Sequence, residues 1–499
     1  MRADGTVVRE RDYRTGRIED WSGRTASRRE HTGQQTDRTD DWPHTKRLMP
    51  WLLAGFMAMV FLIPIDATEV KVHLPVDSKP DRFVLAAMFM VLVIKALLPT
   101  TGEHRSRRRM TVVMAAVLIF GALVLVSVLF NVDRIYRLGE LTFAEKALSQ
   151  VLAYLGFFMI VATQVRKSEV AAFGRLILGL AVITALGTLY ESHSGYNIFY
   201  VLGGQLLHPI ATVAPSPTNI HPTFLEGRKI IVGPTKHGLA LASMLSIAMP
   251  FAVIGVSEAK AARGRIGYLL IICLLLAAAL ATGRKTAIVA PLAAFVVLVA
   301  YNRRMLRWTP VALLVLIPAI HFVAPGALGT FHVLASAGSS DSTTQRISDY
   351  SGIAPDVLSH PVIGEGYGSL DSDNARWYRI LDNEYLGELF QVGILGVLAY
   401  LAMVLAPLVT AHGVIRRASG RAPPIVAAAA GCAAYAVVSG TFDAMSFPQA
   451  PYSFFFVAGL IAAAAAARGD QAALGPGRRL ANLRSRVRHR SRQRAGATA

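Results

Sequence analysis

The chain has 499 residues, of which 53% are hydrophobic and only 17% charged, and its mean hydropathy is +0.43. These values exclude an ordinary soluble enzyme and favour a protein whose solvent is the lipid bilayer. The two cysteines lie within apolar stretches, which excludes a disulfide framework. The formal net charge of +19 leaves anionic lipid or nucleic acid as partners for the basic segments.

Apolar runs of about 15 to 21 residues, separated by polar connections, recur along the chain. A helix of this length crosses the hydrocarbon core of a bilayer, which is about 30 Å thick. We therefore predict an all-α integral membrane protein with about twelve transmembrane helices. Their expected positions are 48–65, 83–99, 110–130, 148–164, 175–190, 238–256, 266–282, 286–301, 308–325, 393–410, 424–440 and 452–467.

The connections between these spans alternate in charge. Cytoplasmic loops retain Lys and Arg, so the basic connections identify the cytoplasmic side. They are 100–109, 165–175, 257–265, 302–307 and 413–421. Both termini are expected on the same side. The two longest connections, about 191–237 and 326–392, fall on the opposite side, so the second of these is a large extracytoplasmic loop between helices 9 and 10.

The two ends of the chain differ from the apolar middle. Residues 1–47 carry nearly balanced Arg and Asp/Glu with few aliphatic side chains, so we expect a disordered cytoplasmic tail. Residues 48–467 are expected to form the polytopic membrane domain. Residues 468–499 hold many Arg against Asp470 alone and predict a basic cytoplasmic tail. Because this tail leaves a span directly, anionic lipid of the inner leaflet is a better partner for it than nucleic acid.

The turn Gly283-Arg284-Lys285 breaks the charge pattern. The connections on either side of this helical hairpin are basic and cytoplasmic, so the turn itself must lie outside, where cations are disfavoured. One interpretation is that Arg284 and Lys285 reach the phosphates of the outer leaflet. The other is an anion site, because two cations at this depth suit the head group of a lipid-linked diphosphate.

The connection 326–392 is acidic. From Asp341 to Glu388 it contains nine acidic residues, and its only cations are Arg346, Arg376 and Arg379. Apolar residues after Arg346 recur at helical spacing and predict an amphipathic segment on the membrane surface. By themselves the arginines have plainer interpretations, because Arg346 could pair with a neighbouring Asp and the other two could lie on a solvated face.

Three short elements follow one another in this connection. They are His360-Pro361-Val362-Ile363-Gly364-Glu365-Gly366, then Leu381-Asp382-Asn383-Glu384-Tyr385-Leu386, then Gly393-Ile394-Leu395-Gly396 at the start of a span. This order resembles the O-antigen ligase and polymerase superfamily (the WaaL and Wzy type). That signature is an Arg, a His-Pro-x-x-Gly-x-Gly element, and a His-Asn-x-Tyr-Leu element before a Gly-Ile-Leu-Gly helix start.

The resemblance extends residue by residue over 284–396. Arg346 matches the loop arginine of the family, and Arg284 matches its other arginine-bearing turn. Asn383, Tyr385 and Leu386 match the third element, and His360 opens the second. Upstream, Arg228 with Gly233 is similar to the Arg-x-x-Gly element of the family, so the ligase-like core is expected at about 228–410.

The resemblance implies a GT-C-like fold and a membrane glycosyltransferase. Such an enzyme would move a glycan from a polyprenyl diphosphate to an acceptor hydroxyl at the outer face of the membrane. The reaction would invert the anomeric carbon, with the arginines stabilising the departing diphosphate, so electrostatics would replace a metal. Asp371-x-Asp373 is similar to a metal-binding motif of soluble glycosyltransferases, but the whole loop is acidic. We assign no metal and no cofactor.

Asp382 stands where many ligases carry a histidine that takes a proton from the acceptor hydroxyl. A carboxylate can also accept a proton. An apolar surrounding would raise its pKa and a nearby arginine would lower it, and the sequence leaves that balance open. Alternatively, Asp382 could cap the following helix or be an ordinary exposed carboxylate. Glu384, Glu388 and His360 are reserves for the base, although His360 also fits a purely structural Pro-Gly turn.

The sequence hypothesis is a polysaccharide polymerase or O-antigen ligase-like glycosyltransferase of the cell (plasma or inner) membrane. Its expected catalytic residues are Asp382, Arg346 and Arg284, and its expected substrate-binding residues are Arg228, Lys285, His360, Asn383 and Tyr385. The expected partners are a lipid-linked glycan donor and a glycan, glycolipid or wall-polymer acceptor. The alternative is a twelve-helix transporter or flippase of an envelope precursor. A transporter would instead place ionisable residues at mid-membrane.

Overall fold

A computed structural model describes most of the membrane-embedded part of the chain. The described residues are 41–72, 78–97, 110–216, 224–225, 228–303, 318, 352–370, 381–418 and 422–466, with the backbone alone at 224–225 and 228–229. The expected span 308–325 lies outside these residues apart from Pro318, and so do most of the N-terminal tail and the whole C-terminal tail.

The chain divides into two compact units, residues 1–51 and residues 52–499. In the first unit, the indole rings of Trp42 and Trp51 meet edge to face with their centroids 5.8 Å apart. The indole Nε1 of Trp51 also donates a hydrogen bond of 3.2 Å to the carbonyl oxygen of Thr45. The second unit contains almost all of the helices.

Helices occupy every expected span that falls on described residues. They are α2 (Leu48–Leu62), α3 (Pro80–Leu97), α4 (Val112–Phe130), α5 (Val132–Arg137), α6 (Leu141–Gln164), α7 (Val170–Ser194), α8 (Ile198–Leu207), α10 (Gly238–Glu258), α11 (Ala262–Ala281), α12 (Thr286–Tyr301), α16 (Glu384–Arg417), α17 (Pro423–Val438) and α18 (Gln449–Ala466). Seven helices of the described part are long and apolar enough to cross a membrane. Four shorter helices, among them α12 and α17, are also apolar. The prediction of an all-α membrane protein is confirmed, and the number of twelve spans stays a prediction.

The structure adds a helical segment before one expected span. The span was expected to begin at Gly393, and α16 already begins at Glu384. Gly393 is non-helical, with φ 73° and ψ −165°, and it separates a first helical part of α16 from the part that begins at the expected position. Two short elements, α5 and α8, were not predicted, because neither is long enough to cross a membrane.

The helices divide into interior and lipid-facing ones. α18 is 94% buried over its most apolar window, whereas α11 is 33% buried and exposes Ile266, Leu269 and Leu270. Both are apolar around their whole circumference, which is typical of helices that meet other helices or lipid on every side. We infer that α18 lies inside the helix bundle and that the exposed side chains of α11 face lipid.

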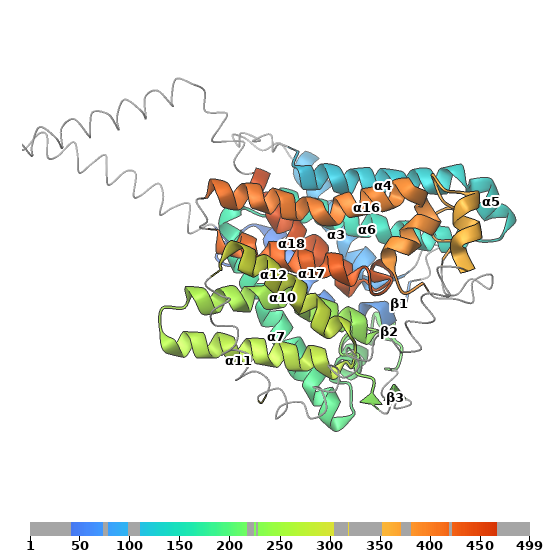
Figure 1. The fold of residues 1–499 in the computed structure, drawn as a ribbon. Coiled ribbons are helices and arrows are strands. Elements are labelled where there is room, and N and C mark those ends of the chain that lie inside the picture. The colour runs from blue at the N-terminus through green and yellow to red at the C-terminus, as the bar shows by residue number, and fades with distance from the viewer. Residues whose placement is uncertain are drawn as a thin grey trace, which may run out of the picture. The chain divides into compact units, whose positions relative to one another are not determined.

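Small side chains bring the central helices close together. α17 packs against α10, α12, α16 and α18, and Figure 1 shows it beside α12 and α10. It contains the run Ala427–Ala430 followed by Gly431. A Cβ atom on Gly431 would lie only 2.8 Å from the carbonyl oxygen of Ile247 on α10. Close backbone approach through small residues is the usual way in which helices associate in lipid, where apolar burial gives no driving force.

The connections expected on the outer side lie together at one end of these helices. Strand β1 (Thr68–Val70) pairs antiparallel with β2 (Ala211–Val213), which joins the connection after α2 to the one after α8. Strands β3 (Phe224–Leu225) and β4 (Arg228–Lys229) form a second antiparallel pair. At the opposite end, the hydroxyl of Tyr301 and Nδ1 of His412 are 3.0 Å apart. This contact joins the cytoplasmic ends expected for α12 and α16.

Candidate functional site

The turn between α11 and α12 positions Arg284 and Lys285. The turn is tight because Gly283 adopts a left-handed conformation with φ 69° and donates its N–H to the carbonyl oxygen of Leu280 at 3.0 Å. Lys285 then occupies the N-cap position of α12, and both cationic side chains are partly exposed. Two cations at the positive end of a helix dipole are unfavourable on their own. An anion bound there would interact favourably with both the side chains and the helix end.

The start of α10 lies against the same turn. A Cβ atom on Gly238 would lie 3.2 Å from the Cβ atom of Thr282, so only glycine allows this approach without a shift of the neighbouring residues. His237 caps α10, because its Nδ1 accepts a hydrogen bond of 3.3 Å from the backbone N–H of Leu239. Burial lowers the pKa of His237 to about 4, and the Arg284 guanidinium adds to this shift. The imidazole is therefore neutral at physiological pH and serves as a hydrogen-bond acceptor.

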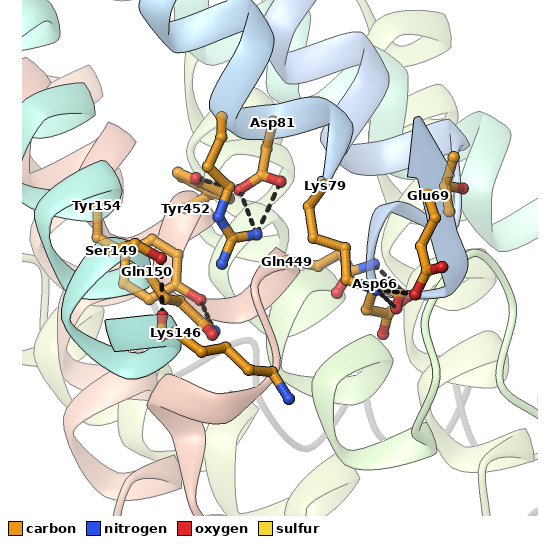
Figure 2. Close-up of polar contacts among 12 residues, drawn as sticks. Asp66, Glu69, Lys79, Asp81, Lys146, Ser149, Gln150, Tyr154, Gln449 and Tyr452 are labelled. Carbon is orange, nitrogen blue, oxygen red and sulfur yellow. Dashed lines mark hydrogen bonds and ion pairs between the residues drawn. The ribbon is translucent and has the colours of Figure 1, made fainter. Parts of the chain in front are cut away.

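Asp66 holds the segment before α10 in place, and Figure 2 shows it beside Lys79 and Gln449. Its carboxylate accepts hydrogen bonds from the backbone N–H of Lys236 at 2.7 Å and from Nε2 of Gln449 on α18 at 3.2 Å. Nζ of Lys79 donates to the carbonyl oxygen of Asp66 at 3.0 Å. Burial raises the pKa of Asp66. This carboxylate thus fixes the backbone next to His237 from a distant part of the sequence.

The start of α16 is held by Asn383. Its Oδ1 accepts hydrogen bonds from the backbone N–H groups of Tyr385 at 3.1 Å and Leu386 at 3.4 Å, which is the arrangement of a helix N-cap. The alternative in which Asp382 caps this helix was therefore wrong, because Asn383 fills that position. Tyr385 donates its hydroxyl proton to the carbonyl oxygen of Ala436 at 2.6 Å, which ties α16 to α17. Asp382 lies just before the cap and is partly exposed.

The connection between α17 and α18, residues 439–448, joins the parts of this site, and we call it the hub loop. Thr441 Oγ1 lies 3.2 Å from Oγ1 of Thr286 at the start of α12. The backbone N–H of Met445 donates to Oε2 of Glu384 at 2.8 Å. The rings of Phe447 and His237 have their centroids 5.3 Å apart. The starts of α10, α12 and α16 therefore all contact one ten-residue segment.

Besides the starts of α10, α12 and α16, helix α6 also contacts the hub loop. The Tyr154 hydroxyl and Nε2 of Gln150 donate hydrogen bonds of 3.1 and 3.0 Å to the carbonyl oxygen of Met445. Figure 2 shows both side chains next to each other on α6, with Tyr452 of α18 beside them. The hub loop therefore has little freedom to move relative to the three helix starts.

The hub loop carries Asp443, which the sequence hypothesis did not include. Burial, with a smaller contribution from the negative charge of Asp382, raises the pKa of this carboxyl to about 7. Its side chain is partly exposed. A signal was present in the sequence, because Asp443 is the only acidic or basic residue between Arg421 and Arg468. A single carboxylate between two apolar spans is a functional candidate by default.

The His-Pro-Gly element lies where α4 packs on α16, and its contacts are with backbone. Its glycines approach other chain segments closely: a Cβ atom on Gly364 would lie 2.4 Å from the backbone carbon of Gln391. Glu365 and Gly366 donate their N–H groups to the carbonyl oxygens of Phe390 and Gln391, both at 3.0 Å. These bonds hold the element against the kink at Gly393.

We call the His-Pro-Gly element, residues 360–366, and the side chains that hold it against Gln391 the clamp. Ser127 of α4 and Arg134 of α5 belong to it, and His360 lies at its edge. Ser127 Oγ donates to the carbonyl oxygen of Gln391 at 2.7 Å, and Arg134 forms an ion pair with Glu365. The ring of His360 is exposed; its Nδ1 is 2.8 Å from Ser359 Oγ and 4.0 Å from Glu365 Oε1. These are structural contacts, in keeping with the Pro-Gly turn that the sequence offered as an alternative role for His360.

Replacing Gly364 with alanine should destabilise this clamp. The residue has φ 73°, which disfavours any side chain, and the added Cβ would collide with backbone rather than with a movable side chain. We expect a loss of about 1–3 kcal/mol, seen as a lower apparent Tm of the detergent-solubilised protein. Gly413→Ala is the matched control, because a Cβ at Gly413 of α16 meets nothing within 4 Å. Equal melting of both variants would contradict the clamp.

The structure describes only some of the remaining predicted residues. Arg346, Arg376 and Arg379 lie outside the described residues, and for Arg228 the backbone alone is described, in β4. Residues 352–359, the described end of the expected amphipathic segment, are helical. Of the predicted set, Arg284, Lys285, Asp382, Asn383 and Tyr385 lie within two residues of Thr286 or Glu384, which contact the hub loop, and His360 belongs to the clamp.

Residues 269–401 match the family model described as O-antigen ligase. This range runs from α11 into α16 and includes the Arg284 turn, the His-Pro-Gly element and Asp382. Arg228 and the hub loop lie outside it. No protein of known, curated function matches the chain.

Proposed function

Through residues 269–401 the chain belongs to the O-antigen ligase and polymerase superfamily, and from this premise we propose that it is a membrane glycosyltransferase. A ligase- or polymerase-type role in glycan assembly follows from the family. The finer proposal is that it transfers a glycan from a polyprenyl diphosphate to an acceptor hydroxyl at the outer face of the membrane. The product would be a cell-surface polysaccharide or exopolysaccharide.

One observation carries this proposal, namely the convergence of positive charge around the hub loop. α10, α12 and α16 all begin at this loop, so the positive ends of three helix dipoles are directed to one region. Arg284 and Lys285 add two cationic side chains to it. His237 and Asn383 already cap the first N–H groups of α10 and α16, so a phosphate would be bound by the two cationic side chains and the start of α12, a recurrent combination at phosphate sites. A diphosphate at the membrane surface fits this arrangement in both charge and position.

In the proposed reaction, an acceptor hydroxyl oxygen attacks the anomeric carbon of the lipid-linked glycan. The bond from that carbon to the diphosphate oxygen breaks, and its electron pair leaves with the diphosphate. Arg284 stabilises the charge that develops there, aided on family resemblance by Arg346 and Arg228. Asp382 takes the proton from the attacking hydroxyl. Attack opposite to the leaving group inverts the anomeric carbon, and the electrostatic stabilisation is supplied by side chains rather than by a metal.

Further parts of the proposal concern the surroundings of the site. Its fold would be of the GT-C-like class, in a multi-pass protein of the plasma or inner membrane with both termini in the cytoplasm. The basic segment 468–499 would bind anionic lipid of the inner leaflet, with about 1 kcal/mol contributed by each cation near the surface. The sequence-predicted substrate-binding residue Lys285 would contact the diphosphate, whereas Asn383 and Tyr385 would hold Asp382 in position.

The test is transfer by the purified protein in detergent or nanodiscs. One reaction contains the polyprenyl-diphosphate-linked oligosaccharide alone. Parallel reactions contain this donor together with a candidate acceptor, and the product size is measured in each. A ladder of products indicates a polymerase, and one discrete addition to an acceptor indicates a ligase. If no donor and acceptor pair gives a product while the protein moves the lipid-linked glycan across a vesicle membrane, the glycosyltransferase proposal is wrong and a flippase replaces it.

A further inference from the structure

Asp443 lies on the hub loop directly opposite the start of α16. Two hydrogen bonds bracket it: the N–H of Glu384 donates to the carbonyl oxygen of Ser439 at 2.8 Å, and the N–H of Met445 donates to Oε2 of Glu384 at 2.8 Å. Asp443 is between the two hub-loop residues that form these bonds, and Asp382 is two residues before Glu384. The two aspartates are thus held on facing backbone segments, and both side chains are partly exposed.

The hub loop also connects Asp443 to the cationic turn. Thr441, two residues before Asp443, contacts Thr286, which is two residues after Arg284. The carboxylates and the anion-binding side chains therefore lie on neighbouring backbone segments. This is the arrangement that a displacement reaction requires, with a proton acceptor on the side of the attacking hydroxyl and cations on the side of the departing diphosphate.

We propose that Asp443 is the second carboxylate of the site, a positioning residue that acts through Asp382 and makes it basic enough to take the proton of the acceptor hydroxyl. This inference rests on the proposed function. When both carboxylates are ionised, their repulsion is relieved by uptake of one proton. That proton comes from the attacking hydroxyl, and it leaves to water once the new glycosidic bond has formed.

The electrostatics of the site support this role. A lone exposed aspartate has a pKa near 3.9 and is a weak base at neutral pH. Burial raises the pKa of Asp443 to about 7, and the charge of Asp382 contributes to that increase. Repulsion between two carboxylates acts on both of them, so Asp443 in turn raises the proton affinity of Asp382. The pair can thus do with two carboxylates what a histidine does alone in many ligases.

The charged and titratable groups around the pair come from every element that contacts the hub loop. They are Asp382, Glu384, Tyr385, Glu388 and Tyr400 at or after the start of α16, Tyr435 on α17, Arg284 and Lys285 before α12, His237 before α10 and Tyr154 on α6. His237 titrates near pH 4 and Arg284 does not titrate in the accessible range. Between pH 5.5 and 8, a change in transfer rate is therefore expected to report on the carboxylates.

The experiment compares pH profiles of kcat for the full-length protein and its Asp443→Asn variant, with a lipid-diphosphate glycan donor. In the unaltered protein the rate should rise with pH through about 7, as the pair becomes fully ionised. In Asp443→Asn, Asp382 loses its negative neighbour and ionises at lower pH. The rising limb should therefore move by about one pH unit or more toward acid, and the plateau rate should fall about tenfold because the base is weaker.

Asp443→Glu keeps the charge and should keep the rising limb near its original position. Glu258→Gln, an exposed carboxylate at the opposite end of α10, is the matched control and should leave the profile unchanged. Asp443→Ser is a second uncharged variant in case Asp443→Asn does not fold. An unmoved limb in the uncharged variants, or a loss of rate that Asp443→Glu does not restore, would overturn the role of Asp443. Absence of transfer by the unaltered protein would instead remove the proposed function itself.

Discussion

The Arg284→Ala variant should lose transfer activity by about a hundred- to thousandfold while remaining folded in the membrane. The guanidinium stands at the start of α12, where the positive ends of neighbouring helices also lie, so its largest contribution is to the charge that develops on the departing diphosphate. The effect should therefore appear in kcat as well as in donor affinity. Arg284→Lys should recover only part of the activity, because an ammonium group cannot bind two phosphate oxygens in the planar manner of arginine.

The control for this variant is Arg263→Ala. Arg263 is exposed near the opposite end of α11, the helix that precedes the Arg284 turn, so its removal changes the net charge equally without touching the site. Insertion is checked by yield from the membrane fraction and by elution as a single species. Normal product formation by Arg284→Ala at normal protein levels would contradict the diphosphate site.

Replacement of Asp382 by asparagine should lower kcat by about a hundred- to ten-thousandfold, since a general base contributes that much to proton transfer. Asparagine keeps the size and the partial exposure of the side chain but cannot accept a proton. Binding of the donor should be nearly unchanged, because the diphosphate is recognised at the Arg284 turn. Titration of a labelled donor analogue against Asp382→Asn and the unaltered protein measures this separation of binding from catalysis.

Asp382→His offers the converse test. Many ligases that this chain resembles carry a histidine at the matching position, and imidazole accepts protons near neutral pH, so this variant should retain much more activity than Asp382→Asn. Asp356→Asn, a carboxylate change in the short helix before the clamp, is a suitable control. If Asp382→Asn and the control show the same rate, another group is the base.

Much of the fold could be predicted because the bilayer imposes simple rules. Length and apolarity identify membrane helices without any knowledge of their neighbours, and the helices on described residues lie where they were expected. The elements that were missed depend on other parts of the chain. The pairing of β1 with β2 joins segments about 140 residues apart in the sequence. The part of α16 before Gly393 depends on the cap at Asn383 and on the hydrogen bonds between Glu384 and the hub loop.

In the candidate site too, the residues with a local sequence signal could be predicted, and those that depend on distant segments could not. Arg284 was found before the fold was known because cations outside the membrane are exceptional. The family motifs identified Asp382, and its environment came only from the structure. Asp443 was missed because it follows the last motif by a whole span and a connection, and only the convergence of α10, α12 and α16 places it opposite Asp382. A lone charge between spans would have been the one local signal.

The clamp at the kink of α16 divides the outer part of the chain into two regions with different freedom to evolve. Every residue from Glu365 through Gly368 is buried, and hydrogen bonds tie this stretch to Arg134 of α5 and to Phe390 and Gln391 of α16. Changes in the connection before Gly352 that keep Arg346 would therefore end at the clamp without displacing Asp382. One membrane-embedded site could in this way serve many acceptors. Substitutions in the connection before Gly352 would change the specificity, while the reacting groups would keep their relative positions.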